Sequence, residues 1–460
     1  MKSLTELVGG DGQSAPPSIV VDRVNDSTRA VDPPEYVPQF VSIGPWHRSP
    51  KLAQDDTKVR ALHDVLSAAA AANGAPMELD VYLTELALLE HGARRFYVHS
   101  FCIPSKEFVR MLLLDGCYIL VRFGDVIRRR DAAAANGLVV PSVERKESGG
   151  GVSQLEAVAV VRDVFYLAEN QIPFFVVDKI HQLTFLDGET PAVDAIASYA
   201  HELLRGNLYS VAKPMVVAPP ARRPEPANLL HLLHMHFKPT VLASPYPKSG
   251  RGSGSGVGGR PVRRWRTATE YSSAGVTFKK RDLDDNNGDV RCILDVKVDR
   301  GGGRLLVPRL NIDAETWRLL RNLMALEQHN PDPEAAGSHV TAYCVFMSQL
   351  ACTTKDVELL SRRGIIAHGL GNHDEVAVHF ANLCKGVVFD VDDPGRNYLR
   401  PACQALDRRF RSRPGRWMAW LKRKYFINPW LAAGLVAAAV GLVCTVIQAV
   451  YSVLSYQRGS

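Results

Sequence analysis

The sequence lacks a cysteine framework. Its eight cysteines are scattered through apolar stretches, and no two of them form a C-x-x-C pair or a tight cluster. Zinc sites and disulfide scaffolds need cysteines at short, regular spacings. Isolated cysteines in a chain of 460 residues are instead typical of reduced, buried, small apolar side chains. The sequence therefore predicts neither a disulfide framework nor a zinc site.

Signals for secretion and for the common enzyme classes are also missing. The amino terminus has no apolar run of the kind that a signal peptide needs. There is no G-x-x-x-x-G-K-[ST], no G-x-S-x-G, no H-E-x-x-H and no kinase signature set. A G-x-G-x-x-G pattern at Gly254, Gly256 and Gly259 follows no expected strand and precedes no apolar helix, so it does not indicate a phosphate site. We predict no catalytic residue, no metal ligand and no cofactor.

A broad excess of positive charge is absent as well, because the formal charge is only +7. Much of this excess lies in one segment without an acidic residue, and its basic residues are Arg408, Arg409, Arg411, Arg413, Arg416, Lys422, Arg423 and Lys424. A nucleic-acid-binding face needs basic residues spread over a domain. We therefore expect no nucleic-acid partner.

A long apolar run follows this basic segment. Trp430 to Leu454 are 25 residues without a charge, long enough as a helix to cross a hydrocarbon core of roughly 30 Å. Aromatic residues stand at both ends of the run. The pattern predicts a single transmembrane helix over residues 430–454, with a short tail at 455–460 and the lipid bilayer as a partner.

The distribution of basic residues predicts the topology of this span. Eight basic residues precede it and only Arg458 follows, which places the amino-terminal domain in the cytosol. We expect a tail-anchored, single-pass protein of the plasma membrane or an endomembrane. The glycosylation pattern Asn25-Asp26-Ser27 would matter only if the domain were lumenal. Gly434, Ala437, Ala438 and Gly441 fit either a pair of closely packed spans or an alanine-rich lipid-facing helix, and both alternatives stay open.

The rest of the chain is predicted to form one helical domain. Residues 1–38 are rich in Pro, Gly, Ser and Asp and predict a mobile tail. Residues 39–425 form the domain, with flexible insertions near 131–152, 214–226 and 245–262. Apolar residues recur at helical spacing through most of it, whereas alternation around residues 292–312 indicates two antiparallel strands joined by a glycine turn. The expected fold class is mainly α with a small antiparallel β element (α+β), plus the carboxy-terminal span.

Two groups of histidines were considered as metal sites. His231, His234 and His236 cannot share one face of a helix, so a surface or partly buried cluster is favoured, with Asn228 as the N-cap of its helix. His368, His373, Asp374 and His379 carry ligand-type side chains. Residues 372–375 fit a helix N-terminus, with Asn372 as cap and acids in the first turn, better than they fit a metal site.

The stretch "LAENQIPFFVVDKI", residues 167–180, places Glu169, Asn170 and Gln171 against Pro173, Phe174 and Phe175. In one interpretation it is a buried corner between two helices, where polar side chains satisfy helix ends and the rings enter the core. In the other, Glu169 joins Asp115 and Asp178 as catalytic carboxylates. The proline and the helical patterns on both sides favour the corner.

Several stretches together resemble the plant family catalogued as domain of unknown function 247. They are "VSIGPWHR", "MLLLDGCYIL", "LAENQIPFFVVDKI", "RTATEYSSAGVTFKK", "LLVPRLNID", "LLRNLMALEQ", "TKDVELLSRRGII" and "YFINPWLAAGL", in order from about residue 39 onward. As structural residues of these motifs we single out Gly44, Pro45, Asp115, Gly116, Glu169, Asn170, Gln171, Pro173, Phe174 and Phe175. Trp46 departs from the family, which more often has tyrosine there, and residues 249–259 look like an individual insertion.

The resemblance implies a largely helical, membrane-anchored plant protein without an established enzymatic activity. Our first hypothesis is that it acts by binding an unidentified protein partner. The resemblance also implies a link to pollen–stigma self-incompatibility, with which some grass members are associated. Two alternatives stay open. One is an unrecognised enzyme with carboxylates near Asp115 and Glu169, and the other is a lipid-contacting scaffold that forms homo-oligomers through its span.

Overall fold

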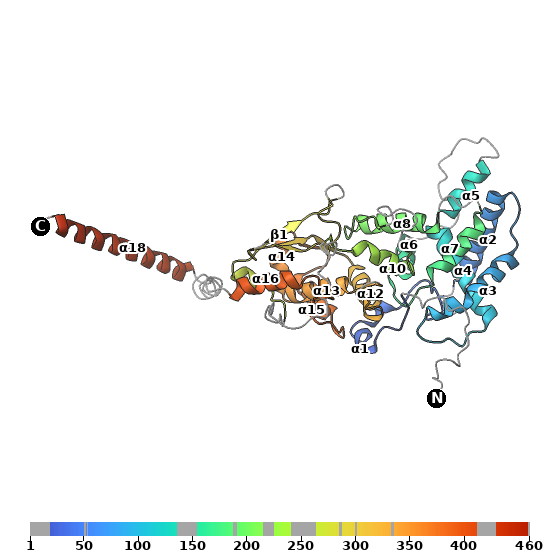
Figure 1. Cartoon of the computed structure of the whole chain (residues 1–460), viewed down its shortest axis with the longest axis horizontal. Coiled ribbons are helices and arrows are strands. Elements are labelled where there is room, and N and C mark those ends of the chain that lie inside the picture. The colour runs from blue at the N-terminus through green and yellow to red at the C-terminus, as the bar shows by residue number, and fades with distance from the viewer. Residues whose placement is uncertain are drawn as a thin grey trace, which may run out of the picture.

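The computed structural model describes residues 19–49, 52, 54–135, 154–186, 191–214, 225–240, 264–284, 288–299, 301–332, 335–411 and 429–458. Figure 1 shows an elongated body with the amino-terminal helices at one end and the sheets at the other. One continuous cluster of buried apolar side chains runs through both ends. The prediction of a mainly helical chain with a minor β element is confirmed.

The amino-terminal end is a bundle of α2 (Asp55–Asn73), α3 (Leu79–Arg95), α4 (Ser105–Phe123), α5 (Val126–Ala135) and α7 (Phe174–Thr184). Helix α4 is buried along most of its length and packs on α2, α3 and α7. Gly116 in α4 allows a close approach, because a Cβ there would lie 2.4 Å from Cδ1 of Ile180 in α7. A larger residue at this position would force the Ile180 side chain to move.

The middle of the body consists of α6 (Gln154–Val161), the π-helical segment η3 (Arg162–Tyr166), α8 (Ala192–Gly206), α10 (Leu229–His234) and η5 (Met235–Phe237). Asn228 caps α10 by accepting a hydrogen bond from the backbone N–H of His231 at 2.7 Å, which confirms the predicted N-cap. These elements connect the amino-terminal bundle to the second half of the chain (Figure 1).

The second half contains α11 (Ala268–Ser273), α12 (Thr316–His329), α13 (His339–Leu350), α14 (Thr354–Arg362), α15 (His373–Leu383) and α16 (Arg400–Arg411). Helices α12 and α13 are buried on most sides and form the centre of this half. The predicted start of α15 is confirmed, because the Asn372 side chain accepts a hydrogen bond from the backbone N–H of Glu375.

Two small sheets lie in this half. One has the order β1 (Thr277–Arg281), β3 (Arg304–Pro308), β2 (Lys297–Val298), and the other pairs β4 (Leu310–Ile312) with β5 (Ile366–His368). The predicted hairpin is present, since β2 and β3 are antiparallel. The prediction of a purely antiparallel element is wrong, because β1 is parallel to β3 and β4 is parallel to β5. Alternation along one segment indicates a strand but not its distant partner.

The segment from residue 19 to residue 38 is packed against the body. It includes the short helices α1 (Asp26–Arg29) and η2 (Pro33–Tyr36), and Ile19, Val21, Val24 and Tyr36 are buried. Val21 is bridged to the end of α3, because its N–H donates to Phe96 O at 2.8 Å and its carbonyl accepts from Val98 N at 3.0 Å. The predicted mobile tail is therefore wrong for residues 19–38, and its first 18 residues lie outside the described ones.

Four of the eight cysteines, Cys117, Cys292, Cys344 and Cys403, are buried as predicted, whereas Cys102 and Cys444 are exposed. All eight are free thiols. Most of the predicted insertions fall on residues 136–153, 215–224 and 241–263, outside the described part of the chain.

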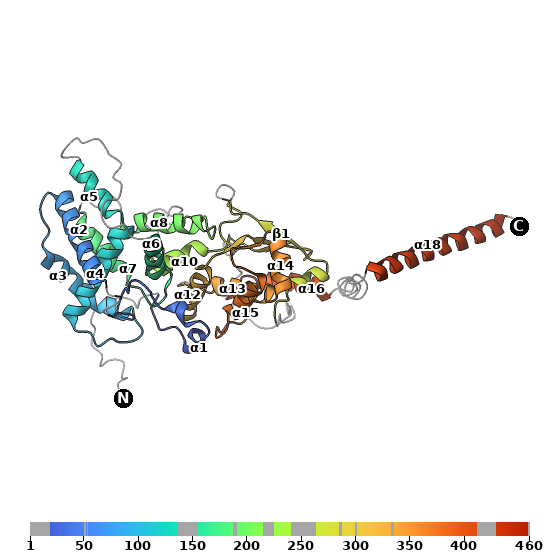
Figure 2. The ribbon, with the colours of Figure 1, turned by 180° about the vertical axis from the view of Figure 1, so that it is seen from behind.

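A last helix, α18 (Pro429–Arg458), lies apart from the body (Figures 1 and 2). It covers the predicted span of residues 430–454. Within the described residues, no helix was found that is both long and apolar enough to cross a membrane. Of the basic segment, Arg408, Arg409 and Arg411 belong to α16, and the other five predicted residues lie outside the described part.

Candidate functional site

The stretch from Leu167 to Pro173 forms a corner between η3 and α7, with Pro173 as the N-cap of α7. Glu169, Asn170 and Gln171 are at most 2% exposed. Phe174 enters the core as expected, but Phe175 is 41% exposed, so the expectation that both rings are buried is wrong for Phe175. Two successive residues at the start of a helix point in different directions, so only one ring can face the core.

The Gln171 side chain joins two helix ends. Its Oε1 accepts hydrogen bonds from Leu229 N at 3.0 Å and Leu230 N at 3.2 Å at the start of α10. Its Nε2 donates to Val164 O and Leu167 O, both at 2.9 Å, at the end of η3. The groups that helix ends leave without partners are therefore satisfied by one amide. This arrangement matches the structural interpretation of the corner.

Asn170 and Asp163 hold the segment from Gln39 to Ile43. Asn170 accepts from Ile43 N at 2.7 Å and donates to Val41 O at 3.1 Å. One oxygen of Asp163 accepts from the backbone N–H groups of Gln39, Phe40 and Val41 at 3.0, 2.6 and 3.0 Å. Asp163 was not predicted from the sequence, although it shows the same pattern as Asp115, a single acid within an apolar helical stretch.

Glu169 is bound by the amino-terminal segment. Its carboxylate accepts from Val24 N at 2.6 Å, pairs with Arg29, and lies 3.0 Å from Nε2 of His47. Burial alone would raise the pKa of Glu169, but the interactions with His47, Arg29 and Val24 outweigh burial and lower it. Glu169 is thus ionised and fully engaged near neutral pH.

Asp115 is bound to the same segment from α4. It accepts from Gly44 N at 2.8 Å and pairs with Nζ of Lys58 at 2.6 Å, and Lys58 also donates to Ser42 O at 2.7 Å. Pro45 is buried next to this contact. The hollow beside Asp115 has a volume of about 10 Å³, comparable to the space that one water molecule needs. Asp178 lies elsewhere, on α7, where its carboxylate accepts from Gln182. These surroundings favour a structural role for Asp115.

His234 is the member of the first histidine group that meets ligand-type residues. His234, Glu327 and His339 place one ligand atom each within 4.8 Å of one another, so they could hold a metal ion. Glu327 also accepts from Val340 N at 2.9 Å and Thr341 N at 2.7 Å, which caps α13. The cluster could not be predicted from the sequence, because Glu327 lies 93 residues from His234.

The three histidines of the first group do not converge on one site. His231 accepts from Ala227 N, and His236 contacts Leu232 O. His234 on α10 and His236 on η5 are buried, not on the surface. Burial lowers the pKa of His231 to about 3 and that of His236 to about 4, so both are neutral near pH 7.

The second histidine group is also divided. His368 Nε2 lies 2.8 Å from His373 Nδ1, and both side chains are partly buried. Asp374 binds the hydroxyl of Thr354, and His379 stacks on Trp317 with ring centroids 5.0 Å apart. The four side chains therefore make three separate sets of contacts.

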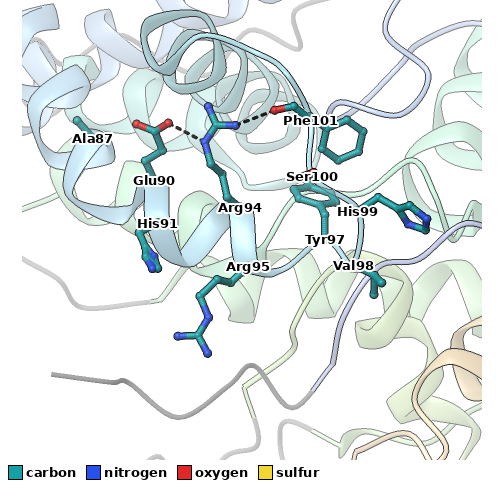
Figure 3. Close-up of a pocket in the computed structure, with 10 residues that line it drawn as sticks. All are labelled: Ala87, Glu90, His91, Arg94, Arg95, Tyr97, Val98, His99, Ser100 and Phe101. Atoms are coloured by element: carbon teal, nitrogen blue, oxygen red, sulfur yellow. Dashed lines mark hydrogen bonds and ion pairs between the residues drawn. The ribbon is translucent and has the colours of Figure 1, made fainter. Parts of the chain in front are cut away.

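A hollow with a volume of about 620 Å³ lies at the carboxyl end of α3. Figure 3 shows the residues that line it, from Ala87 on α3 to Phe101 in the following loop. Arg94 fixes this loop, because it pairs with Glu90 at 2.7 Å and donates to Phe101 O at 3.3 Å and Ile103 O at 2.7 Å. We call this feature the α3 hollow.

Apolar side chains are exposed at and beside the α3 hollow. Val98 lines it and is 55% exposed, and Leu88 on α3 is 75% exposed. Phe175 lies near Gly92, where an added Cβ would be 3.7 Å from its ring. Leu88, Gly92 and Arg95 are spaced by four and three residues, so they share one face of α3. The hollow therefore combines exposed apolar surface with basic side chains.

Both the fold and the sites define a mainly helical protein in which an amino-terminal segment is held by buried carboxylates and amides. A model of the DUF247 family, described as plant protein of unknown function, matches residues 21–444, so the chain belongs to that family. The Arabidopsis thaliana protein named UPF0481 protein At3g47200 is 24% identical over 456 residues, an alignment that covers 95% of this chain and 87% of that protein. No solved structure matches the chain.

Proposed function

We propose that this protein is a membrane-attached interaction component, and that a protein partner docks at the α3 hollow. The observation that carries this proposal is the exposure of Val98 in the lining of a hollow with basic residues, together with the exposed side chains of Leu88 and Phe175 outside that lining. Isolated exposed apolar residues are common, but several of them beside a large hollow are typical of a protein contact. Basic and aromatic side chains also contribute strongly to many such contacts.

The α3 hollow is held in shape by the rest of the fold. Trp46 packs edge-on against Phe101 at 4.9 Å between ring centroids, and Tyr97 contacts the same ring at 5.5 Å. The hydroxyl of Tyr97 donates to Gln171 O at 2.9 Å, which ties the hollow to the buried corner. A surface fixed in this way loses little conformational entropy on binding. Trp46 and Gln171, which belong to the family motifs, thus help to hold the α3 hollow in shape.

Attachment to a membrane is proposed through α18. The support is the uncharged sequence from Trp430 to Leu454 and the exposure of the apolar side chains of α18, among them Leu442, Val443, Ile447 and Val450. Arg408, Arg409 and Arg411 on α16 precede this helix and would meet anionic headgroups. In this arrangement the helical domain is cytosolic, and the membrane is the plasma membrane or an endomembrane.

Docking is tested with a photo-crosslinking amino acid placed at position 98 in the full-length chain. We expect it to capture one defined protein in plant cells, and we expect Leu88→Asp to reduce that capture at least tenfold. Val378, which is 57% exposed on α15, is the matched control position. Equal capture from positions 98 and 378 would contradict docking at the α3 hollow.

Membrane attachment is tested separately by alkaline carbonate extraction of plant microsomes. The full-length chain should stay in the pellet, and a variant with Val443→Lys and Val446→Lys should be released. A protease added to sealed vesicles should digest the helical domain. Protection of that domain, together with glycosylation at Asn25, would overturn the cytosolic orientation.

The biological setting that we propose, pollen–stigma recognition, rests on the family resemblance. It predicts that the protein accumulates in pollen or stigma, and that its removal changes the acceptance of self pollen. If plants without the protein still reject self pollen normally, the proposed role in pollen–stigma recognition is contradicted. That result would not bear on docking at the α3 hollow.

A further inference from the structure

A second cavity lies between the amino-terminal segment, α12 and the turn that follows α15. Its volume is about 300 Å³, and its lining includes Arg23, Asn25, Thr28, Arg321, His329 and Val388. We propose that this cavity binds a small anion, a molecule with a carboxylate or phosphate group, through the charge of Arg321.

Arg321 is a buried cation without a counterion. It is 2% exposed, and its Nε and Nη1 atoms are buried without a hydrogen-bond partner. None of the ion pairs in the described part of the chain includes it. A buried lysine can lose its proton, but a guanidinium keeps its charge at any physiological pH. An unpaired buried charge is costly, so a negative partner is expected beside it.

The nearest acidic group does not fill this role. The charge of Arg321 acts to lower the pKa of Glu35, so the two groups are near each other. The ion-pair partner of Glu35 is nevertheless Arg318, because Oε2 of Glu35 lies 3.0 Å from Nε of Arg318. Burial raises the pKa of Glu35, and the charges of Arg318 and Arg321 oppose this effect. The hydroxyl of Tyr36 also lies near Arg321, but burial raises the pKa of Tyr36, so it is neutral. Glu35 therefore compensates the charge of Arg321 only from a distance, and Arg321 has no ion-pair partner in the described part of the chain.

The other charged groups of the cavity leave room for an anion. Asp22, the acid in the lining, is already bound by its contact with His99 Nδ1 at 3.1 Å. His329 is neutral near pH 7, because burial lowers its pKa. Arg23 adds a second positive charge, although an exposed one whose closest acid is Asp26 at 3.9 Å. An anion that enters would meet one buried and one exposed arginine.

The rim of the cavity is built by a close contact between two distant segments. A Cβ on Gly386 would lie 2.8 Å from Thr28 N, and the Thr28 hydroxyl donates to Gly386 O at 3.2 Å. Gly386 has φ of +79°, which glycine adopts without strain. A volume near 300 Å³ holds a small organic anion and stands at the lower end of ligand-binding pockets.

The proposal makes an unusual prediction for Arg321→Gln. Without a bound anion this variant should be at least as stable as the natural chain, because it removes an unpaired buried charge. If Arg321 served packing alone, the same change would destabilise the fold. Arg321→Lys supplies a positive charge only when the buried ammonium is protonated, so it should keep at most part of the anion response.

The experiment is thermal unfolding of the full-length chain in detergent with inorganic phosphate, acetate or citrate, against sodium chloride at equal ionic strength. We expect one of the anions to raise the midpoint temperature of unfolding of the natural chain. The same anion should bind at least tenfold more weakly to the Arg321→Gln variant. Comparison of phosphate with the carboxylates identifies the preferred group. No anion-specific shift, or an equal shift in Arg321→Gln, would overturn the proposal.

A second variant keeps the test valid if Arg321→Gln does not fold. Val388 is 80% exposed at the cavity, so Val388→Trp should be tolerated and should obstruct entry. Val378→Trp on α15 is the matched control, because Val378 is also exposed but does not line the cavity. The anion response should fall with Val388→Trp and persist with Val378→Trp, and the reverse outcome, or no difference, would refute the site.

Discussion

Gly44 lies so close to Gln171 that a Cβ on Gly44 would stand 2.6 Å from the carbonyl oxygen of Gln171. The backbone of Gly44 has φ of +75°, and its N–H donates to Asp115 at 2.8 Å. Two motifs that are far apart in the sequence therefore meet without room for any side chain. The glycine of "VSIGPWHR" is needed because of the polar corner formed by "LAENQIPFF".

The first prediction concerns this contact. Gly44→Ala combines a left-handed backbone with a clash against a carbonyl oxygen, so it should lower the free energy of unfolding by roughly 3 kcal/mol or more. Gly74→Ala is the control, because Gly74 has φ of +70° and nothing within 4 Å of an added Cβ. It should cost only about 1 kcal/mol. Denaturant unfolding measures both, and equal losses would show that the contact with Gln171 does not matter.

The second prediction concerns Glu169. Glu169→Gln leaves Arg29 without its buried partner and should cost about 3 kcal/mol. The control is Glu90→Gln, which removes a more exposed pair with Arg94 and should cost less than about 1 kcal/mol. If unfolding of the two variants in denaturant shows similar losses, the carboxylate of Glu169 does not hold the amino-terminal segment.

How much of this corner could be predicted from the sequence depends on the range of each interaction. The helices on both sides, the break at Pro173 and the need for polar groups at helix ends are all local properties, and they led to the right interpretation. The partners of Glu169 could not be found in this way, because Val24 and Arg29 are 145 and 140 residues away. Nothing local in a stretch rich in proline and aspartate shows that it will be bound.

The same limit explains the errors in the sheets and the histidines. Strand β4 pairs with β5 more than 50 residues later, so alternation around Leu310 could not reveal a parallel neighbour. His234 was placed correctly on a helix, but its approach to Glu327 and His339 depends on how α10 packs between other elements. The α3 hollow was missed because exposure of Leu88 and Val98 is a property of packing and not of composition.

The third prediction is a pH dependence from buried neutral histidines. Burial lowers the pKa of His181 from 6.5 to about 4. Below about pH 6.5 the unfolded chain therefore binds a proton at His181, whereas the folded chain does not until the pH approaches 4. The free energy of unfolding consequently falls as the pH drops from 6.5 towards 4. Between pH 7 and pH 5, His181 alone should account for a loss of about 1–2 kcal/mol.

The variant that checks this is His181→Phe, which keeps an aromatic ring beside Phe185. Its free energy of unfolding should change less between pH 7 and pH 5 than that of the natural chain. His91→Phe is the control for the exchange of histidine for phenylalanine itself, because His91 is exposed. An identical slope in the natural chain and His181→Phe would show that burial does not lower the pKa of His181.

The fourth prediction concerns pairing of α18 between two copies of the chain. Gly434, Ala437, Ala438 and Gly441 form a stripe of small residues, and nothing lies within 4 Å of an added Cβ at either glycine. In a bilayer such a stripe lets two helices approach closely.

If α18 pairs through it, changing both Gly434 and Gly441 to leucine should abolish the chemical crosslinking of two full-length copies in membranes. Val443→Leu, on the opposite face of α18 by helical spacing, is the control and should crosslink normally. Crosslinking that survives in the double variant would place the contact elsewhere and favour a lipid-facing role for the stripe.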